Sequence, residues 1–435
     1  MQDVISAIST PSGAGGVAVI RLSGGGALGI AEKMFVPSGK TAVSDFVPNV
    51  MYAGRICCDG FEDYGLCVYF RSPKSFTGED SVEFHCHGGV QIARGVLAKT
   101  LSLGARAAEK GEFTKRAFIN GKLSLSSAEG VIDMINAESL ASLRAGSMLY
   151  AEKLTYEIKK LQGGLTDVLA EIAASLDYPE EDIDGIDERE IKLKIVGLES
   201  KLTALANSYS CGKKIKDGVT VAICGAPNTG KSSLLNALLG YDKAIVSDEA
   251  GTTRDAVEGS IEINGVQFRF ADTAGLRERA GNIESIGIER AKKIISSADV
   301  ILSVSDGCGY ADIPGCCGSV IKVFNKCDIR PSDGVCDVCI SAKTGEGLEK
   351  LKRKLSEAAV GELSLDKAYI IEQRHYSALI RAADSLKNAI DNISEPPDIL
   401  SIDLKEAWDA LGEITGETAN EEIINTVFEK FCVGK

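Results

Sequence analysis

The sequence has no apolar run close to the ~20 residues that cross a bilayer, and it is poor in positive charge. Lys and Arg number 48 against 62 Asp and Glu, which gives a net charge of -14. This balance opposes the long-range attraction expected of a protein that grips nucleic acid across its whole surface. If RNA is involved, a local patch or a basic partner must hold it. We expect a soluble protein without a membrane-spanning segment.

We expect no secretory leader, because residues 1–16 contain neither a basic region nor an apolar core. The 13 cysteines are scattered over 435 residues and do not have the dense spacing of a small disulfide scaffold. Reduced thiols in the cytoplasm fit this usage best. The length itself predicts two or three domains, each able to bury a core.

The pattern of apolar and polar residues changes along the chain. Residues 1–120 mix short strand-like runs with one helical stretch, which predicts a small N-terminal α+β domain. Residues 121–210 and 366–435 have apolar side chains at three- and four-residue spacing, which is typical of long packed helices. Between them, residues 211–365 alternate strands with helices and predict a parallel sheet. We expect an α/β domain inserted into a discontinuous helical domain.

A phosphate-binding loop is predicted at Gly225-Ala-Pro-Asn-Thr-Gly-Lys-Ser232, which fits G-x-x-x-x-G-K-[ST]. It follows a strand and precedes a helix, so backbone N–H groups at the helix start can surround phosphate oxygens. Lys231 would contact the β- and γ-phosphates, and Ser232 would bind Mg²⁺.

Two further segments complete the phosphate side of the site. Asp272-Thr-Ala-Gly275 ends a strand that begins at Val266 and pairs with Ile261–Ile263 through the hairpin dipeptide Asn264-Gly265. Asp272 can reach the Mg²⁺ shell, and the Gly275 N–H can sense a γ-phosphate. Gly251-Thr-Thr-Arg-Asp255 lies between these motifs, where a mobile threonine can close on Mg²⁺ and the γ-phosphate.

The base is identified by Asn325-Lys-Cys-Asp328, which follows an apolar strand. An aspartate carboxylate accepts two hydrogen bonds from the guanine N1–H and amino group, a pair that adenine does not offer. Ser341-Ala-Lys343 would complete the base pocket. The predicted GTP-binding residues are Asn228, Thr229, Gly230, Lys231, Ser232, Ser233, Ser247, Gly251, Thr252, Thr253, Asp272, Thr273, Ala274, Gly275, Asn325, Lys326, Asp328, Ser341, Ala342 and Lys343.

Hydrolysis needs a group that orients water. Ras-type enzymes place a glutamine directly after Asp-Thr-Ala-Gly, but this chain has Leu276 there, which neither donates nor accepts a hydrogen bond. Our hypothesis is that Glu284 orients the water and that Lys231 assists catalysis. The alternative for Glu284 is a solvated surface charge.

The order of these motifs, together with the C-terminal Phe431-Cys-Val-Gly-Lys435, resembles one family: the tRNA modification GTPases called MnmE or TrmE. The resemblance covers essentially the whole chain. The other matching segments are Ala7-Ile-Ser-Thr-Pro11, Ser75-Phe-Thr-Gly-Glu-Asp80, His87-Gly-Gly89, Gly111-Glu-Phe-Thr-Lys-Arg-Ala-Phe118, Asp177-Tyr-Pro-Glu-Glu-Asp182 and Gly412-Glu-Ile-Thr-Gly-Glu417.

The resemblance implies an enzyme that works with the flavoprotein MnmG. Together they would add a carboxymethylaminomethyl or aminomethyl group at C5 of the tRNA wobble uridine, with a reduced folate as carbon donor. It also implies a homodimer through the N-terminal domains and a heterotetramer with MnmG. GTP hydrolysis would drive this chemistry.

The resemblance assigns residues as well. It implies that Arg21, Glu83 and Lys122, with Lys435 nearby, bind formyl- or methylene-tetrahydrofolate in a folate-binding-like fold. Cys432 would act in the modification chemistry as a nucleophile or as a general acid and base. Without the family, each charged group is an ordinary surface charge, and the alternative for Cys432 is a thiol packed against the helices.

Two metal ions are implied at the nucleotide. Mg²⁺ would be held by Ser232 and Thr253. K⁺ would be held at Asn228, with Ser247, Glu249 and Thr252 from the following loop, and would supply charge that an arginine finger supplies elsewhere.

Other interpretations stay open. A ribosome-assembly GTPase of the Era or EngA type would share the nucleotide motifs, and so would a dimeric signalling GTPase whose helices only transmit the nucleotide state. Cys336-Asp-Val-Cys339 has the spacing of half a zinc or redox site, but no second pair follows at a zinc-ribbon distance. The same caution applies to His85-x-His87.

Overall fold

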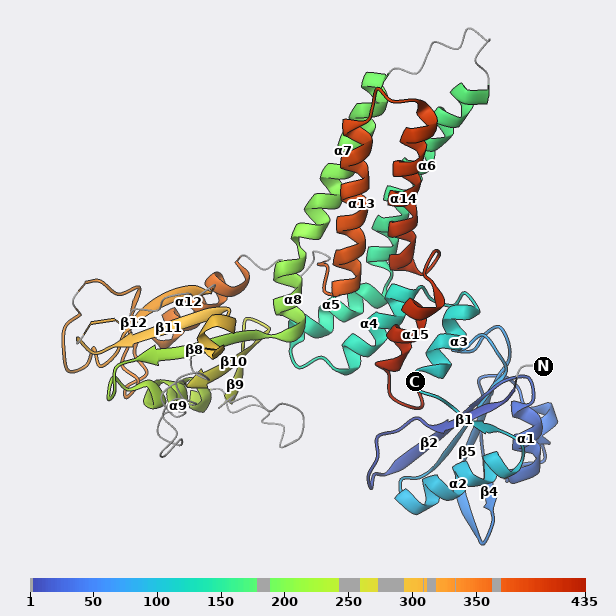
Figure 1. The fold of residues 1–435 in the computed structure, drawn as a ribbon. Coiled ribbons are helices and arrows are strands. Elements are labelled where there is room, and N and C mark those ends of the chain that lie inside the picture. Colours follow the sequence, from blue (N-terminus) through green and yellow to red (C-terminus); the bar gives the residue numbers. More distant parts are fainter. Residues whose placement is uncertain are drawn as a thin grey trace. The chain divides into compact units, whose positions relative to one another are not determined.

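The computed structural model describes residues 3–177, 188–241, 259–272, 293–307, 309–310, 318–332, 334–361 and 369–435. The chain divides into two compact units (Figure 1). The first unit comprises Met1–Ile132, Leu149–Asp167 and Trp408–Lys435, and the second comprises Asp133–Met148 and Val168–Ala407. Each unit therefore joins segments that are far apart in the sequence. The domain boundaries near residues 120, 210 and 365 stay predictions.

The first unit is built on a seven-stranded sheet in the order β3-β4-β5-β6-β2-β1-β7. Its neighbouring strands are antiparallel except for β1 and β7, which are parallel. The strands are β1 (Ile5–Ile8), β2 (Val17–Ser23), β3 (Phe35–Pro37), β4 (Met51–Cys58), β5 (Phe61–Phe70), β6 (Ser81–His87) and β7 (Arg106–Ala107).

The two faces of this sheet differ because side chains alternate along each strand. Ile20 and Phe84 are paired in register and fully buried in a core that also takes in α1 (Ala27–Met34), the short η1 (Val43–Asp45) and α2 (Val90–Ser102). The neighbouring pair, Arg21 and Glu83, points to the opposite face, which carries the candidate site.

The remainder of the first unit is helical. A second core joins α4 (Leu125–Ile135) to α15 (Glu421–Glu429) through buried Leu125, Val427 and Phe428. The helix α3 (Glu112–Ile119) also contacts α15, and Phe118 and Phe428 have ring centroids 6.2 Å apart. These contacts bring the end of the chain to the N-terminal sheet.

The second unit contains a six-stranded sheet in the order β13-β12-β11-β8-β10-β9, in which β9 is antiparallel and the other pairs are parallel. Its core includes the fully buried Val221, Phe268 and Val304. The strands are β8 (Val219–Gly225), β9 (Gly259–Ile263), β10 (Val266–Asp272), β11 (Val300–Ser305), β12 (Ser319–Phe324) and β13 (Val338–Cys339), and the helices packed on them are α8 (Tyr209–Asp217), α9 (Lys231–Tyr241) and α12 (Leu348–Val360).

Long helices accompany that sheet. In the second unit α7 (Glu188–Asn207) and α13 (Gln373–Asp391) run side by side (Figure 1), and α13 buries a stripe that includes Leu379, Ala383 and Leu386. The other long helices are α5 (Leu140–Tyr150), α6 (Lys153–Asp177) and α14 (Pro397–Thr415), of which α6 and α14 contribute to both units.

An ion cluster ties three helical segments of the second unit together. Lys216 on α8 contacts Asp133, 2.7 Å away, and also Glu372 at the start of α13. Both carboxylates are largely buried, and Asp133 Oδ2 has no hydrogen-bond partner. Burial and the neighbouring charge of Glu372 raise the pKa of Asp133 to about 7.

The regular elements agree with those predicted. The mixed strand and helix pattern, the long helices and the parallel sheet are all confirmed. Asn264 and Gly265 both have positive φ, as a two-residue hairpin requires. Pro397 is the first residue of α14, where its missing N–H costs nothing. Within the described ranges, no helix is both long and apolar enough to cross a membrane.

Candidate functional site

The loop between β8 and α9 has the backbone of a phosphate-binding loop. Gly225 has φ +154°, and a Cβ there would lie 2.2 Å from the Val304 carbonyl oxygen. Gly230 has φ +88°, and a Cβ there would lie 2.3 Å from Asn325 Nδ2. Both positions therefore require glycine, because a side chain would strike neighbouring groups of the sheet edge. Asn228 also has a positive φ, +63°, between them.

Lys231 places its cation inside this loop. Its Nζ donates to the carbonyl oxygens of Gly225, at 3.1 Å, and Ala226, at 2.8 Å, and the residue is buried. An ammonium held there is positioned for charge-assisted hydrogen bonds to phosphate oxygens. Lys231 also begins α9, whose N-terminal dipole favours an anion at the same place.

Asn325 links the loop to the predicted base pocket. Its Nδ2 donates to the Thr229 carbonyl at 2.9 Å, and its Oδ1 accepts from the Ala342 N–H at 3.0 Å. The side chain is buried, so these bonds are not exchanged for water. One amide therefore holds three of the predicted motifs in a fixed arrangement.

Lys326 makes a second link. Its Nζ donates to the Asn228 carbonyl and contacts Asp306 Oδ2, both at 2.7 Å. Asp328 and Lys343 are exposed, while Ser341 is fully buried and accepts a hydrogen bond from the Thr344 N–H at 3.2 Å. The Asp328 carboxylate is thus accessible to a guanine edge, and the loop behind it is fixed.

The remaining nucleotide predictions divide into two groups. Ser232 and Ser233 lie exposed in the first turn of α9, and Asp272 ends β10 beside Ile223 of β8. A serine hydroxyl is an oxygen ligand of the kind that Mg²⁺ accepts. Outside the described residues lie Ser247, Glu249, Gly251, Thr252, Thr253, Thr273, Ala274, Gly275, Leu276 and Glu284.

A second polar site lies on the outer face of the N-terminal sheet. Arg21 Nε and Glu83 Oε1 are 2.8 Å apart, and the guanidinium carbon lies 5.7 Å from the Phe76 ring centroid and 5.8 Å from that of Phe113. His85 Nε2 is 3.4 Å from the other oxygen of Glu83. Burial opposes ionisation of Glu83, but His85 and Arg21 outweigh it and leave its pKa below the ordinary value.

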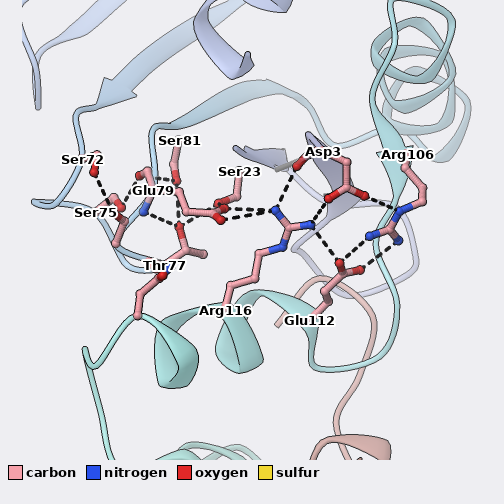
Figure 2. A network of polar contacts seen from close by, with 12 residues as sticks. Asp3, Ser23, Ser72, Ser75, Thr77, Glu79, Ser81, Arg106, Glu112 and Arg116 are labelled. Carbon is pink, nitrogen blue, oxygen red and sulfur yellow. Dashed lines mark hydrogen bonds and ion pairs between the residues drawn. The ribbon is translucent and has the colours of Figure 1, made fainter. Parts of the chain in front are cut away.

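The segment that carries Phe76 is anchored by a buried polar network (Figure 2). Glu79 Oε2 accepts from Ser23 Oγ at 2.8 Å and from Arg116 at 3.1 Å. Thr77 Oγ1 lies 2.7 Å from the same Ser23 hydroxyl. Each carboxylate and hydroxyl has a partner, so the segment from Ser75 to Asp80 is held against β2 and α3.

The network continues around Arg116. Its guanidinium also pairs with Asp3, at 2.7 Å, and Glu112, at 3.0 Å, while Arg106 bridges the same two carboxylates (Figure 2). Hydrogen bonds from Arg106 and Arg116 hold the pKa of Asp3 below its ordinary value. Glu112 also has a lowered pKa, because these hydrogen bonds outweigh its burial.

Lys122 lies on the other side of the anchored segment. Its Nζ donates to the Pro73 carbonyl at 3.0 Å, and a Cβ at Gly78 would lie 3.3 Å from its Cγ. Arg21 and Lys122 therefore contact the same segment, Arg21 at Phe76 and Lys122 at Pro73, and Glu83 pairs with Arg21.

The end of the chain binds the same domain. Gly111 N–H donates to the Cys432 carbonyl at 3.3 Å, Lys110 and Val433 form a β-bridge, and Ser9 Oγ donates to the Gly434 carbonyl at 3.2 Å. Cys432 itself is exposed. The flanking Phe431 enters the core that joins α4 and α15. A role for Cys432 in the chemistry, and the alternative of a thiol partly packed against the helical domain, both stay predictions.

Several residues of the site around Arg21 are not predicted by the sequence. Phe76 and Phe113 flank Arg21 from segments more than fifty positions away, and no local spacing marks them. The sequence marks His85 only as part of the pattern His85-x-His87, although its two-residue spacing from Glu83 on a strand places both side chains on one face. His87 binds Asp63, with Nδ1 and Oδ1 2.6 Å apart, so the two histidines have different carboxylate partners.

Comparisons with known families cover nearly the whole chain. Residues 4–122 match the model described as GTP-binding protein TrmE N-terminus, and residues 125–432 match the model described as MnmE helical domain. Neither match is limited to the nucleotide motifs. The Era or EngA interpretation is therefore wrong, since GTPases of that type would lack such an N-terminal domain.

Individual relatives agree. The tRNA modification GTPase MnmE of Acetivibrio thermocellus is 39% identical over 100% of this chain and 99% of its own length. That of Carboxydothermus hydrogenoformans is 39% identical over 100% of both chains. The G domain of the T. maritima FeoB iron transporter is 29% identical over 32% of this chain and 98% of its own, with a TM-score of 0.25 too low to bear on the fold. The chain belongs to the MnmE (TrmE) family of tRNA modification GTPases.

Proposed function

We propose that this protein hydrolyses GTP to drive the addition of a carboxymethylaminomethyl or aminomethyl group at C5 of the tRNA wobble uridine. A flavoprotein of the MnmG type would act with it, and formyl- or methylene-tetrahydrofolate would supply the carbon. The observation that carries this proposal is the position of Cys432. Cys432 is exposed and lies in a C-terminal segment that is hydrogen-bonded to the domain that holds Arg21 and Glu83.

The nucleotide half rests on the gathered motifs. Lys231 would bind the β- and γ-phosphates, and Asp328 would read guanine. Mg²⁺ would be held by Ser232 and Thr253, and K⁺ by Asn228, Ser247, Glu249 and Thr252. Both ions, when bound, would offset the negative charge of the phosphates. Glu284 would orient the attacking water.

The folate half rests on charge and shape. The lowered pKa keeps Glu83 ionised at neutral pH, so its carboxylate can accept paired hydrogen bonds from a pterin amino group and ring N–H. Arg21, Lys122 and Lys435 are cations suited to carbonyl or glutamate oxygens of the folate. Phe76 and Phe113 add flat apolar surface beside Arg21.

The partners follow from the same proposal. We infer a homodimer through the N-terminal domains, a heterotetramer with the MnmG-type flavoprotein, tRNA as substrate and action in the cytoplasm. The net charge of -14 supports the need for a basic partner or patch that holds the RNA.

Reconstitution with tRNA, reduced folate, the flavoprotein, GTP and K⁺ tests the proposal. Cys432→Ser should abolish formation of the modified uridine and leave GTP turnover unchanged, because Cys432 is not among the nucleotide residues. Cys57→Ser, a partly exposed thiol on β4, is the matched control and should retain both activities. Full modification by the Cys432→Ser protein would contradict the proposal.

A further inference from the structure

Two cysteines of the second unit face each other beside the nucleotide site. Cys336 Sγ and Cys339 Sγ are 3.0 Å apart, closer than the roughly 3.5–4.0 Å of ordinary nonbonded contact, and Ser332 Oγ lies 3.2 Å from Cys336 Sγ. Both thiols are partly buried. Within the described ranges, no group of three or more His, Cys, Asp or Glu could hold a metal ion. The two thiols are close enough for dithiol chemistry.

The strand that carries Cys339 also supports the two motifs of the predicted base pocket. Cys339 pairs with Phe324 in register, directly before Asn325. Ile340 N–H donates to the Phe324 carbonyl at 2.7 Å, and the Ile340 carbonyl accepts from the Cys327 N–H at 3.1 Å. Two residues beyond Ile340, the Ala342 N–H binds Asn325 Oδ1. A displacement of Cys339 would therefore move both motifs of the base pocket, Asn325-Lys-Cys-Asp328 and Ser341-Ala-Lys343.

Packing leaves Cys339 little freedom to move without that effect. A Cβ at Gly347, which precedes α12, would lie 2.2 Å from the Cys339 carbonyl oxygen. The glycine lets the start of α12 press directly on this strand, so a shift of the strand also moves the turn from Ser341 to Gly347. The Ser341 N–H is hydrogen-bonded to the Glu346 carbonyl within that turn.

We propose that Cys336 and Cys339 form a reversible disulfide that lowers the affinity for guanine nucleotide; this rests on the proposed GTP binding. The oxidant is a small-molecule disulfide of the glutathione class. One protein thiolate attacks it and releases one small thiol, and the second protein thiolate displaces the other. The protein pair loses two electrons and two protons, and the oxidant takes them up as two thiols.

The expected behaviour is that of a sensor. In a reducing compartment disulfides are rare and usually transient, so the pair is reduced at rest. Burial raises the pKa of the Cys336 thiol, which slows exchange at neutral pH and makes it faster as the pH rises.

The test uses the full chain, reduced or treated with oxidised glutathione and then alkylated. Cys327, Cys336 and Cys339 lie in one tryptic peptide, since Arg330 precedes Pro331 and is not cleaved. Fragment spectra of the oxidised protein should place the remaining alkyl group on Cys327 and a loss of two hydrogens between Cys336 and Cys339. Titration with fluorescent GDP should give an affinity about tenfold weaker, restored by dithiothreitol. Cys336→Ser and Cys339→Ser should lose this response, and Cys57→Ser should keep it.

Two results would overturn the inference. One is alkylation of Cys336 and Cys339 that is unaffected by the oxidant. The other is a disulfide between them with GDP affinity unchanged or higher. Tight GDP binding by the reduced protein with no redox response would reject this switch alone, whereas a reduced protein that does not bind GDP would also reject the proposed function.

Discussion

The nucleotide site and the N-terminal polar site hold their key side chains in different ways. In the first, Lys231, Lys326 and Asn325 donate to main-chain carbonyls of the phosphate-binding loop. In the second, charged side chains hold one another, as in Arg21 with Glu83 and Arg116 with Glu79. A carbonyl is present whatever the residue, whereas an ion pair needs two particular residues at once. The first site can therefore be recognised from short sequence motifs, whereas the second depends on the topology of the sheet.

The largest effect should come from the base-reading carboxylate. Asp328→Asn replaces an acceptor with an amide that cannot accept both guanine hydrogen bonds, so GDP affinity should fall about a thousandfold, or ~4.2 kcal/mol. Titration with fluorescent GDP measures it. Glu83→Gln, in the other site, should bind GDP normally. A similar loss in both variants would break the distinction between the two sites.

The next effect concerns the buried network of the first unit. Arg116→Met leaves Glu79, a buried carboxylate, without its cation and should reduce the free energy of unfolding by ~3 kcal/mol. Arg55→Met removes a pair with Glu62 that is about half exposed, and should cost less than ~1 kcal/mol. Hydrogen exchange of β2 and β6 during denaturant titration compares them. Equal costs would show that the network does not hold this site together.

A smaller effect is expected for the folate-facing cation. Arg21→Ala should weaken binding of formyl-tetrahydrofolate about thirtyfold, or ~2 kcal/mol, through the loss of a charged hydrogen bond. Arg94→Ala is the matched control, because Arg94 is exposed on α2, which covers the opposite face of the sheet. Calorimetric titration measures both proteins. Unchanged folate affinity with Arg21→Ala would remove the assignment of this face.

The smallest effect is a pH dependence in the second unit. The pKa of Asp133 is raised in the folded protein to about 7, so folding takes up a proton between the unfolded and folded pKa values. The contribution of this group is then highest near the unfolded pKa and falls as the pH rises. Between pH 6 and 8 alone the fall is ~1 kcal/mol, or about 3 °C in the midpoint. Asp133→Asn should flatten the curve. A midpoint that rises with pH in the wild type would contradict the sign.

The contrast between the sites also explains what could be predicted from the sequence. The strands and the hairpin at Asn264-Gly265 follow from alternation and turn chemistry, and both are confirmed. Motif spacing predicts the place of Lys231, which lies in the loop between β8 and α9 and donates to two of its carbonyls, whereas its role at the phosphates stays a prediction. Nothing local in the sequence predicts that Phe113 lies beside Arg21. Such contacts arise when β2, β6 and α3 assemble, and single-sequence patterns do not encode pairings across so many residues.

The closeness of Cys336 and Cys339 lies between these extremes. Their spacing was visible in the sequence, but a strand places residues three apart on opposite faces, and only the turn before β13 brings the two thiols together.

The central claim is that the polar face of the N-terminal sheet serves RNA modification and that the nucleotide site works without it. Mass analysis of wobble uridines from cells whose only copy carries Glu83→Gln tests this most directly, with GTP turnover of the purified variant measured alongside. We predict that the modified uridine disappears while turnover stays at the wild-type rate. Wild-type levels of the modified uridine in these cells would contradict the account.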